Sequence, residues 1–263
     1  MKDKLNSKEK KFNILTIVCA LLFCTTSFTA RADQRLYAAA VAGFIEPFHE
    51  IAAAFEKETG VSVVVSFASA GRLYAQIENG APYDIYLSAD TERPALLNEK
   101  SLCEEPFVYA RGEVILWSAN RNFCRPASWQ EALLQKDVRK ISIPNPLTGV
   151  HGTHAKLALT QAGLWDYVEP KLVTGQDIAQ TFQYAVIGAV DAAFCSPVHA
   201  LSAAGQKGCF YQMPEAPPVI YGACVLTGSP RRETARRFAE FCLSPVARQI
   251  KQKYGYKETL NNK

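Results

Sequence analysis

The sequence predicts an α/β fold, because short apolar strands alternate with amphipathic helical segments along the chain. The run 61–67 is β-branched and apolar, as a central parallel strand should be. Asn79-Gly80 and Pro82 separate the following helical segment from the next apolar run, and similar breakers recur along the chain. The composition, 48% hydrophobic and 21% charged, is that of an ordinary globular protein.

The first half of the chain carries the clearest periodicity. Phe48, Ile51 and Phe55 fall on one face of an expected helix. Leu73 and Ile77, four residues apart, share a face of a second one. We therefore expect strands over 35–40, 61–67, 85–87 and 114–117, and helices over 47–58, between Ser69 and Asn79, and over 93–100.

Start signals define the helices of the second half. Ser128 and Glu131 form a capping box, which opens a helix. Ser229-Pro230 and Ser244-Pro245 place proline in a first turn, where its missing N–H costs nothing. The other expected elements are strands over 140–143, 189–195 and 219–226 and helices over 153–162 and 177–187.

The first 32 residues have the pattern of a secretory signal peptide. Five lysines precede an apolar run of thirteen residues, 12–24, which is too short to span a bilayer comfortably. Ala30-Arg31-Ala32 then supplies a cleavage site with small residues. A retained membrane anchor is the alternative, and the bulky Phe23 before Cys24 argues against a lipoprotein. We expect export to the periplasm.

The basic character of the sequence belongs to this leader. Six of the 29 basic and two of the 25 acidic residues lie in it, which leaves 23 of each sign in the expected mature chain. A mature protein without net charge gives no reason to expect nucleic acid or an acidic membrane surface as a partner.

Six cysteines follow the expected cleavage site. An even number in an exported protein predicts up to three disulfides, with pairings that the sequence leaves open. Buried free thiols are the alternative, since cysteine also packs as a small apolar residue. No CxxC pair is present, so zinc is not expected. The six are Cys103, Cys124, Cys195, Cys209, Cys224 and Cys242.

Four segments end a strand or loop and open a helix. They are 40–44, 69–72, 149–153 and 175–178. A helix N-terminus presents unpaired backbone N–H groups and the positive end of the helix dipole, so it can bind an anion without a cationic side chain. One such segment alone is an ordinary helix start. Four of them converging on one cleft would form an anion site.

The block 66–90, SFASAGRLYAQIENGAPYDIYLSAD, resembles the periplasmic molybdate-binding proteins that serve ABC importers. Weaker matches in the same order are Tyr37 to Ala40, Ala155-Lys156, Gly163-Leu164-Trp165, and the stretch from Ser244-Pro245 to Tyr256. The resemblance covers nearly all of the chain after residue 33. It implies a two-lobed type II periplasmic-binding-protein fold with a hinge cleft.

The resemblance also implies a division into lobes. Two crossing strands are expected near 112–117 and 221–226. The first lobe then consists of 33–112 and 221–263, and the second lobe is the insert 113–220.

The function implied is that of a periplasmic solute-binding component. Such a protein captures a small oxyanion, molybdate or tungstate, in the cleft, closes, and delivers it to the membrane subunits of an ABC importer. It is expected to be a monomer and not an enzyme, and to need no cofactor or metal.

Carrying the family's site residues over gives an unusual set. The family's three hydroxyl positions fall at Val41, Ala70 and Phe194, so only their backbone groups remain. The two backbone loop positions fall at His151 and Ile178. Ser69 and Gly71 flank Ala70 in the binding block. The expected ligand-binding residues are therefore Val41, Ser69, Ala70, Gly71, His151, Ile178 and Phe194.

The missing hydroxyls keep other readings open. A hydrogen bond to a charged partner contributes about 1.5–3 kcal/mol, so losing three would cost on the order of 5–9 kcal/mol. Ser69, Thr148, Thr153, Tyr221 and Arg72 are possible replacement donors. Otherwise the ligand is a less hydrated or organic anion, or the protein is a periplasmic sensor without a transport role.

Two further alternatives concern chemistry. His151 and His154, three residues apart, could share a metal ion, but no third ligand has a readable spacing to them. Cys195 is the one candidate nucleophile for an enzyme, against the commoner role of a structural cysteine.

Overall fold

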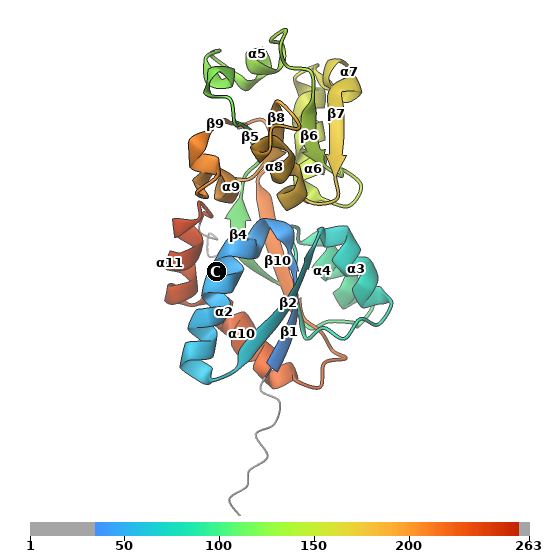
Figure 1. The fold of residues 1–263 in the computed structure, drawn as a ribbon. Helices are drawn as coiled ribbons and strands as arrows, with labels where there is room; N and C mark the ends of the chain where they lie inside the picture. Colours follow the sequence, from blue (N-terminus) through green and yellow to red (C-terminus); the bar gives the residue numbers. More distant parts are fainter. Residues whose placement is uncertain (1–34, 258–263) are drawn as a thin grey trace, which may run out of the picture. The chain divides into compact units, whose positions relative to one another are not determined.

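A computed structural model describes residues 35–257, which form two five-stranded sheets with helices (Figure 1). The expected signal peptide, 1–32, lies outside the described residues. Within the described part, no helix combines the length and the apolar character needed to cross a membrane. The α/β fold predicted from alternating strands and helices is confirmed.

The first sheet has the strand order β2-β1-β3-β10-β4. Strands β1, β2 and β3 are parallel, and β10 runs antiparallel to both of its neighbours. Helices α2, α10 and α11 lie on one side of this sheet, and α3 and α4 lie on the other (Figure 1). The bounds are β1 Arg35–Val41, β2 Ser62–Ala68, β3 Ile85–Leu87, β4 Phe107–Gly112, β10 Val219–Val225, α2 Ile45–Thr59, α3 Ala70–Glu78, α4 Glu92–Glu99, α10 Arg232–Leu243 and α11 Pro245–Lys253.

The second sheet has the order β7-β6-β8-β5-β9. Strand β6 is parallel to β7 and β8, whereas β5 is antiparallel to β8 and β9. The bounds are β5 Ile115–Ser118, β6 Ile141–Pro144, β7 Leu172–Gly175, β8 Ala192–Cys195, β9 Cys209–Gln212, α5 Trp129–Leu133, α6 Val150–Gln161, α7 Trp165–Val168, α8 Ile178–Val186 and α9 Pro197–Leu201. Four short 3₁₀ turns complete the described elements: η1 Ala42–Phe44, η2 Arg121–Cys124, η3 Glu169–Lys171 and η4 Gly205–Lys207.

Alternate residues of the second sheet pack into two separate cores. Ile115 and Trp117 of β5 pack with α8, while Leu116 between them packs in the cluster that contains α6. Side chains of a strand point alternately to the two faces of its sheet, so α6 and α8 cover opposite faces. Phe194 of β8 packs on the α6 face and is fully buried.

Two connections join the sheets. Strand β4 ends at Gly112 in the first sheet, and β5 begins three residues later in the second. The chain returns through 213–218, between β9 and β10. The second crossing was expected near 221–226, which lies within β10, and β10 pairs with β4 from Val219 and Gly112 onward. The apolar run that predicts a crossing strand is the interior of the first sheet.

A buried carboxylate anchors the first sheet. Asp84 accepts hydrogen bonds from the Tyr37 backbone N–H at 2.7 Å, from Ser229 Oγ at 2.6 Å and from Arg231 Nε at 2.9 Å. Its side chain is 1% exposed. A buried charge is tolerated when it is paired and hydrogen-bonded, so this cluster fixes the N-terminal end of β1 against the segment after β10.

One disulfide joins Cys124 of η2 to Cys209 of β9. The other four cysteines of the described part are buried free thiols, so both sequence-based readings of the cysteines hold for some of them. The free thiols are Cys103, Cys195, Cys224 and Cys242.

Several element boundaries differ from expectation. The helix expected from Thr153 begins at Val150, because Gly149 is its N-cap and no side chain caps it to mark the start. The strand expected from Ala189 begins at Ala192, since a turn with positive φ at Gly188 precedes it. Strands β4, β7 and β9 were not predicted; β7 and β9 are four-residue edge strands, too short for a readable alternation.

Candidate functional site

The carboxyl ends of the parallel strands converge on one small cavity. Each of β1, β2, β6 and β7 ends where a turn or helix begins, and residues after all four strands line the cavity. Ligands of open α/β sheets bind at this end of the strands. The lining residues are Val41–Gly43, Ala68–Ala70, Ala89, Pro144, Gly149–His151, Asp177 and Ile178.

The cavity is the size of one compact ion. The space open to the centre of a water-sized sphere is about 20 Å³. Treated as a sphere and extended by the ~1.4 Å radius of water, this space holds an ion of roughly 3 Å radius. Among the described residues that line it, none is a lysine or an arginine.

The hydroxyl of Ser69 lines this cavity without a partner. Ser69 is the N-cap residue of α3 and is 6% exposed, yet its side chain makes no capping hydrogen bond. Its Oγ is buried and has no hydrogen-bond partner among the described residues. A buried hydroxyl left unpaired costs about 1–3 kcal/mol, so such a group points to a partner that is bound in use.

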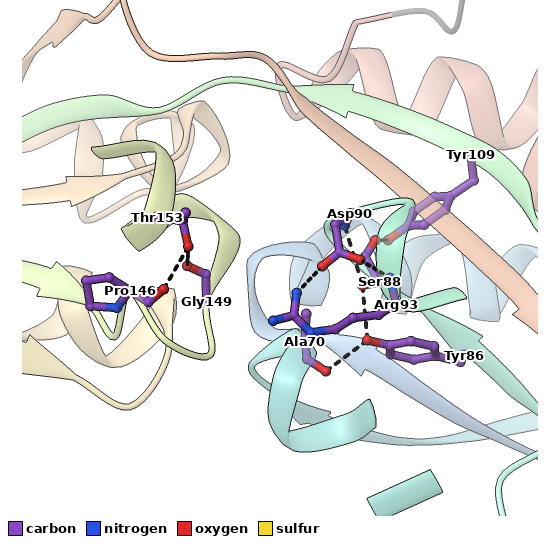
Figure 2. A network of polar contacts seen from close by, with 9 residues as sticks. All are labelled: Ala70, Tyr86, Ser88, Asp90, Arg93, Tyr109, Pro146, Gly149 and Thr153. Carbon is purple, nitrogen blue, oxygen red and sulfur yellow. Dashed lines mark hydrogen bonds and ion pairs between the residues drawn. The ribbon is translucent and has the colours of Figure 1, made fainter. Parts of the chain in front are cut away.

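Side chains of β3 fix the start of α3 (Figure 2). The Tyr86 hydroxyl donates to the Ala70 carbonyl at 2.9 Å, and Ser88 Oγ lies 3.0 Å from the same hydroxyl. Tyr109 in turn donates to the Ser88 carbonyl at 3.1 Å. All three side chains are buried, so the helix start beside Ser69 is held rigidly.

The loop before α6 is held by a side chain of α6 and by β7. Thr153 Oγ1 donates to the Pro146 carbonyl at 2.8 Å (Figure 2). The Asn145 N–H donates to the Gly175 carbonyl of β7 at 2.9 Å. Gly152 allows the helix to pass close to the end of β6, since a Cβ there would lie 2.0 Å from the Pro144 oxygen. These contacts aim the first turn of α6 at the cavity.

His151 is the only imidazole among the described lining residues. It is 4% exposed, and its Nε2 lies 3.2 Å from the hydroxyl of Tyr221 on β10. Burial, with smaller contributions from nearby His199 and His154, lowers the pKa of His151 to about 3. The imidazole is therefore neutral in the ligand-free protein at neutral pH.

The two sides of the cavity touch each other directly. The Gly71 N–H donates to the Thr148 carbonyl at 3.0 Å, and Arg72 Nη1 donates to Gln176 Oε1 at 2.9 Å. Each pair joins α3, on the first sheet, to a loop of the second. These contacts and the bond between Tyr221 and His151 join the two sheets beside the cavity.

Electrostatics at this cavity come mainly from backbone. Helices α3, α6 and α8 all begin at it, and the first N–H groups of a helix have no partner within the helix. Their dipoles favour negative charge. The Asp177 side chain caps α8 by accepting from the Gln180 N–H at 2.9 Å. The arrangement suits a small anion.

Comparison with known proteins agrees with this architecture. The family model described as bacterial extracellular solute-binding protein matches residues 36–257. The chain belongs to this family. It is 32% identical to the molybdate-binding protein ModA of Rhodobacter capsulatus over 229 residues, which is 86% of this chain and 89% of the relative. It is 31% identical to ModA of Azotobacter vinelandii over 251 residues, 93% of this chain and 98% of the relative.

A solved structure shares the fold of this solute-binding protein. The periplasmic molybdate-binding protein of Azotobacter vinelandii superposes with a TM-score of 0.81 at 28% identity, over 86% of this chain and all of that one. The periplasmic-binding-protein fold implied by the resemblance is thereby confirmed.

The solute-binding fold brings five of the seven expected site residues to the cavity. Val41, Ser69, Ala70, His151 and Ile178 line it.

The other two lie outside the lining. Gly71 contacts Thr148 across the sheets, and Phe194 is buried in the core of the second sheet. Whether any of the seven contacts a ligand stays a prediction.

The structure places the possible replacement donors in different surroundings. Ser69 alone lines the cavity. Tyr221 bonds to His151, and Thr153 Oγ1 is used by the loop before α6. Arg72 is exposed and reaches Gln176.

The structure supports neither a shared metal ion at the two histidines nor a reactive thiol at Cys195. His154 Nδ1 donates to the Pro217 carbonyl at 3.1 Å while His151 faces Tyr221, so the two histidines have separate partners. No three potential metal-ligating side chains gather anywhere in 35–257. Burial raises the pKa of the Cys195 thiol, which disfavours the reactive thiolate.

Asp177 and Gly43 line the cavity but were not among the expected site residues. Asp177 could have been found as the N-cap of the helix expected over 177–187. Gly43 lies in η1, and a Cβ there would lie 3.3 Å from Ile178 Cγ2. No sequence pattern signals a close approach between two residues so far apart in the chain.

Proposed function

We propose that this protein is the periplasmic solute-binding component of an ABC importer and captures a tetrahedral oxyanion of the molybdate and tungstate type. Its relatives at 31–32% identity are molybdate-binding proteins, and they match most of its length. Its cavity is the size of one compact ion, and three helices begin at it. The readings as a sensor or as a carrier of an organic anion have no comparable support.

The observation that carries the proposal is the unpaired hydroxyl of Ser69. An oxyanion in the cavity would accept a hydrogen bond from Ser69 Oγ, which has no partner among the described residues. It would also accept from the first N–H groups of α3, α6 and α8. Ser69 stands next to Ala70, so the side-chain donor is displaced by one residue from the position that the family resemblance implies.

We propose that the two sheets belong to two lobes that close on the ligand. The expected division is 33–112 with 221–263 for one lobe and 113–220 for the other. The connections at 112–115 and 213–218 would bend. The contacts between Gly71 and Thr148 and between Arg72 and Gln176 would form on closure. The membrane subunits would then recognise the closed form, provided that ligand favours it over the open form.

The same proposal covers the remaining expectations. The leader would direct the chain to the periplasm, where the protein would act as a monomer without cofactor. Its role would be binding and delivery, with no chemical conversion of the ligand.

Replacing Ser69 by alanine tests the proposed donor. We expect Ser69→Ala to weaken molybdate binding by about 1.5–3 kcal/mol, which is roughly 10- to 150-fold. The free energy of unfolding of the ligand-free protein should stay the same or rise slightly, because the lost hydroxyl had no partner. Isothermal titration calorimetry and urea unfolding measure the two quantities.

Ser142→Ala provides the matched control. Ser142 is equally buried, but its Oγ donates to the Thr181 carbonyl at 2.8 Å and lies away from the cavity. This variant should lose stability and keep its affinity. An unchanged molybdate affinity in Ser69→Ala would show that the hydroxyl is not a ligand donor.

A further inference from the structure

The cavity contains a single side chain that can become a cation. Of the described residues that line it, only His151 can carry positive charge. Its Nε2 lies 3.2 Å from the hydroxyl of Tyr221, which belongs to the other sheet. A Cβ placed on Gly43 would lie 3.7 Å from His151 Cε1, so η1 also packs against the ring. The ring of this lining residue is thus held between β10 and η1.

The charged and titratable groups around His151 come from four elements. His154 on α6 and His199 on α9 disfavour a proton on it. Tyr221 on β10 is neutral, because burial raises its pKa. Asp177 at the start of α8 lines the same cavity. In the ligand-free protein burial and the two histidines act in the same direction, and the pKa of His151 is about 3.

We propose that the cavity binds an anion together with a proton, which His151 accepts when a doubly charged oxyanion enters. The inference rests on the proposed function and specifies its ligand as a dianion. The proton comes from solvent and forms an N–H bond on the imidazole ring; no bond of the oxyanion breaks. The imidazolium then neutralises half of the ligand charge inside the closed cavity.

The physical reason is the strength of charge interactions in a closed cavity. An opposite charge within about 4–6 Å favours the protonated imidazole, and a dianion does so about twice as strongly as a monoanion. Each helix N-terminus is equivalent to only about half an elementary charge, so the three helix starts together fall short of the two charges of a dianion. The attraction of the dianion therefore opposes the burial that keeps the empty site neutral.

Proton uptake gives the affinity a definite pH dependence. The pKa of His151 is higher with the ligand than without it, so binding takes up a proton between the two values. The dissociation constant should rise with pH between the two pKa values, by at most about tenfold per pH unit, and should level off above the ligand-bound pKa. A tetrahedral monoanion of the same shape, such as perrhenate, should bind more weakly and take up less of a proton.

Calorimetry in buffers with different ionisation enthalpies counts the protons. We expect the intact protein to take up about one proton per molybdate at pH 7.5, where molybdate itself is unprotonated. His151→Asn should take up none. His154→Asn is the matched control, because His154 lies three residues along α6 and does not line the cavity, and it should take up as many protons as the intact protein.

The possible results distinguish proton uptake by His151 from the oxyanion-binding function on which it rests. Molybdate binding without proton uptake, or with equal uptake in His151→Asn, would overturn the inference and leave the oxyanion-binding function standing. Absence of any binding of molybdate or tungstate to the intact protein would overturn both. Thermal unfolding of the ligand-free variants shows that each one is folded before its protons are counted.

Discussion

Single side chains at the cavity differ in whether they satisfy their own hydrogen-bonding groups. His151 has Tyr221 as a partner, whereas Ser69 Oγ has none among the described residues. Buried polar groups are paired in nearly all native proteins, so an unpaired hydroxyl in the lining of a cavity marks a position where a ligand is the natural partner. The ligand-free site therefore pays a small cost in stability that binding recovers.

Two buried histidines predict acid sensitivity. Burial lowers the pKa of His151 to about 3 and that of His199 to about 4, against an ordinary value of 6.5. Below pH 6.5 the unfolded chain binds more protons than the folded protein, so stability is lost as pH falls. The expected loss of unfolding free energy is up to about 1.4 kcal/mol per pH unit for each histidine, between pH 6.5 and about 4.

Urea unfolding at pH 7.5, 6 and 5 measures this effect. Carboxylates also contribute to acid unfolding, so the comparison is between variants. His199→Asn should reduce the pH dependence, and the exposed His49→Asn should leave it as in the intact protein. Identical pH dependence in all three proteins would contradict the assignment of His199 as a buried neutral histidine.

For single residues, the sequence predicts which segments form the anion site better than it predicts which side chains face that site. Ser69 and His151 lie in recognisable segments, and both were expected at the site. Phe194 was expected there as well, but β8 turns its ring toward α6 and into the core. The direction of a strand residue depends on register, and one residue of register moves a side chain to the other face of the sheet.

Among the elements, α3 has the most specific role at the cavity. Its N-terminus carries Ser69, its first carbonyl is held by Tyr86, and its second residue, Gly71, touches the loop before α6. A Cβ at Gly71 would lie 3.2 Å from both the Cα and the carbonyl oxygen of Thr148. Backbone atoms cannot easily move away, so a side chain at this position would keep the sheets apart.

Gly71→Val should therefore weaken ligand binding by at least about tenfold, or 1.4 kcal/mol. The ligand-free protein should keep its stability, because an open arrangement avoids the contact. Gly228→Ala is the control, since a Cβ at Gly228 has no neighbour within 4 Å. Calorimetric titration with molybdate measures both, and an unaltered affinity in Gly71→Val would show that this contact is not needed for binding.

Elements with strong periodicity or caps were predictable, and those without were not. Ser128 accepts from the Glu131 N–H as its capping box requires, and α5 follows. Helix α6 has glycine as its N-cap, so its first turn, which contains His151, was expected to be loop. Edge strand β9 is stabilised by its disulfide and by pairing with β5, neither of which a local pattern reveals.

For the whole molecule, the proposed closure makes ligand binding and closure one equilibrium. The two sheets meet at the cavity through backbone and side-chain contacts from distant parts of the sequence. A ligand at the meeting point stabilises the closed arrangement by its differential affinity for that arrangement. The family resemblance predicted this architecture, whereas the way the two halves touch depends on tertiary contacts that periodicity does not encode.

The central claim is that this cavity binds a molybdate-type oxyanion, and thermal unfolding of the mature protein with an anion panel tests it most directly. Molybdate and tungstate should raise the unfolding temperature, since a ligand at 100 times its dissociation constant adds about 2.7 kcal/mol. Sulfate, phosphate and small organic anions serve as comparisons. No shift with molybdate or tungstate at millimolar concentration, beside a clear shift with another anion, would contradict the account.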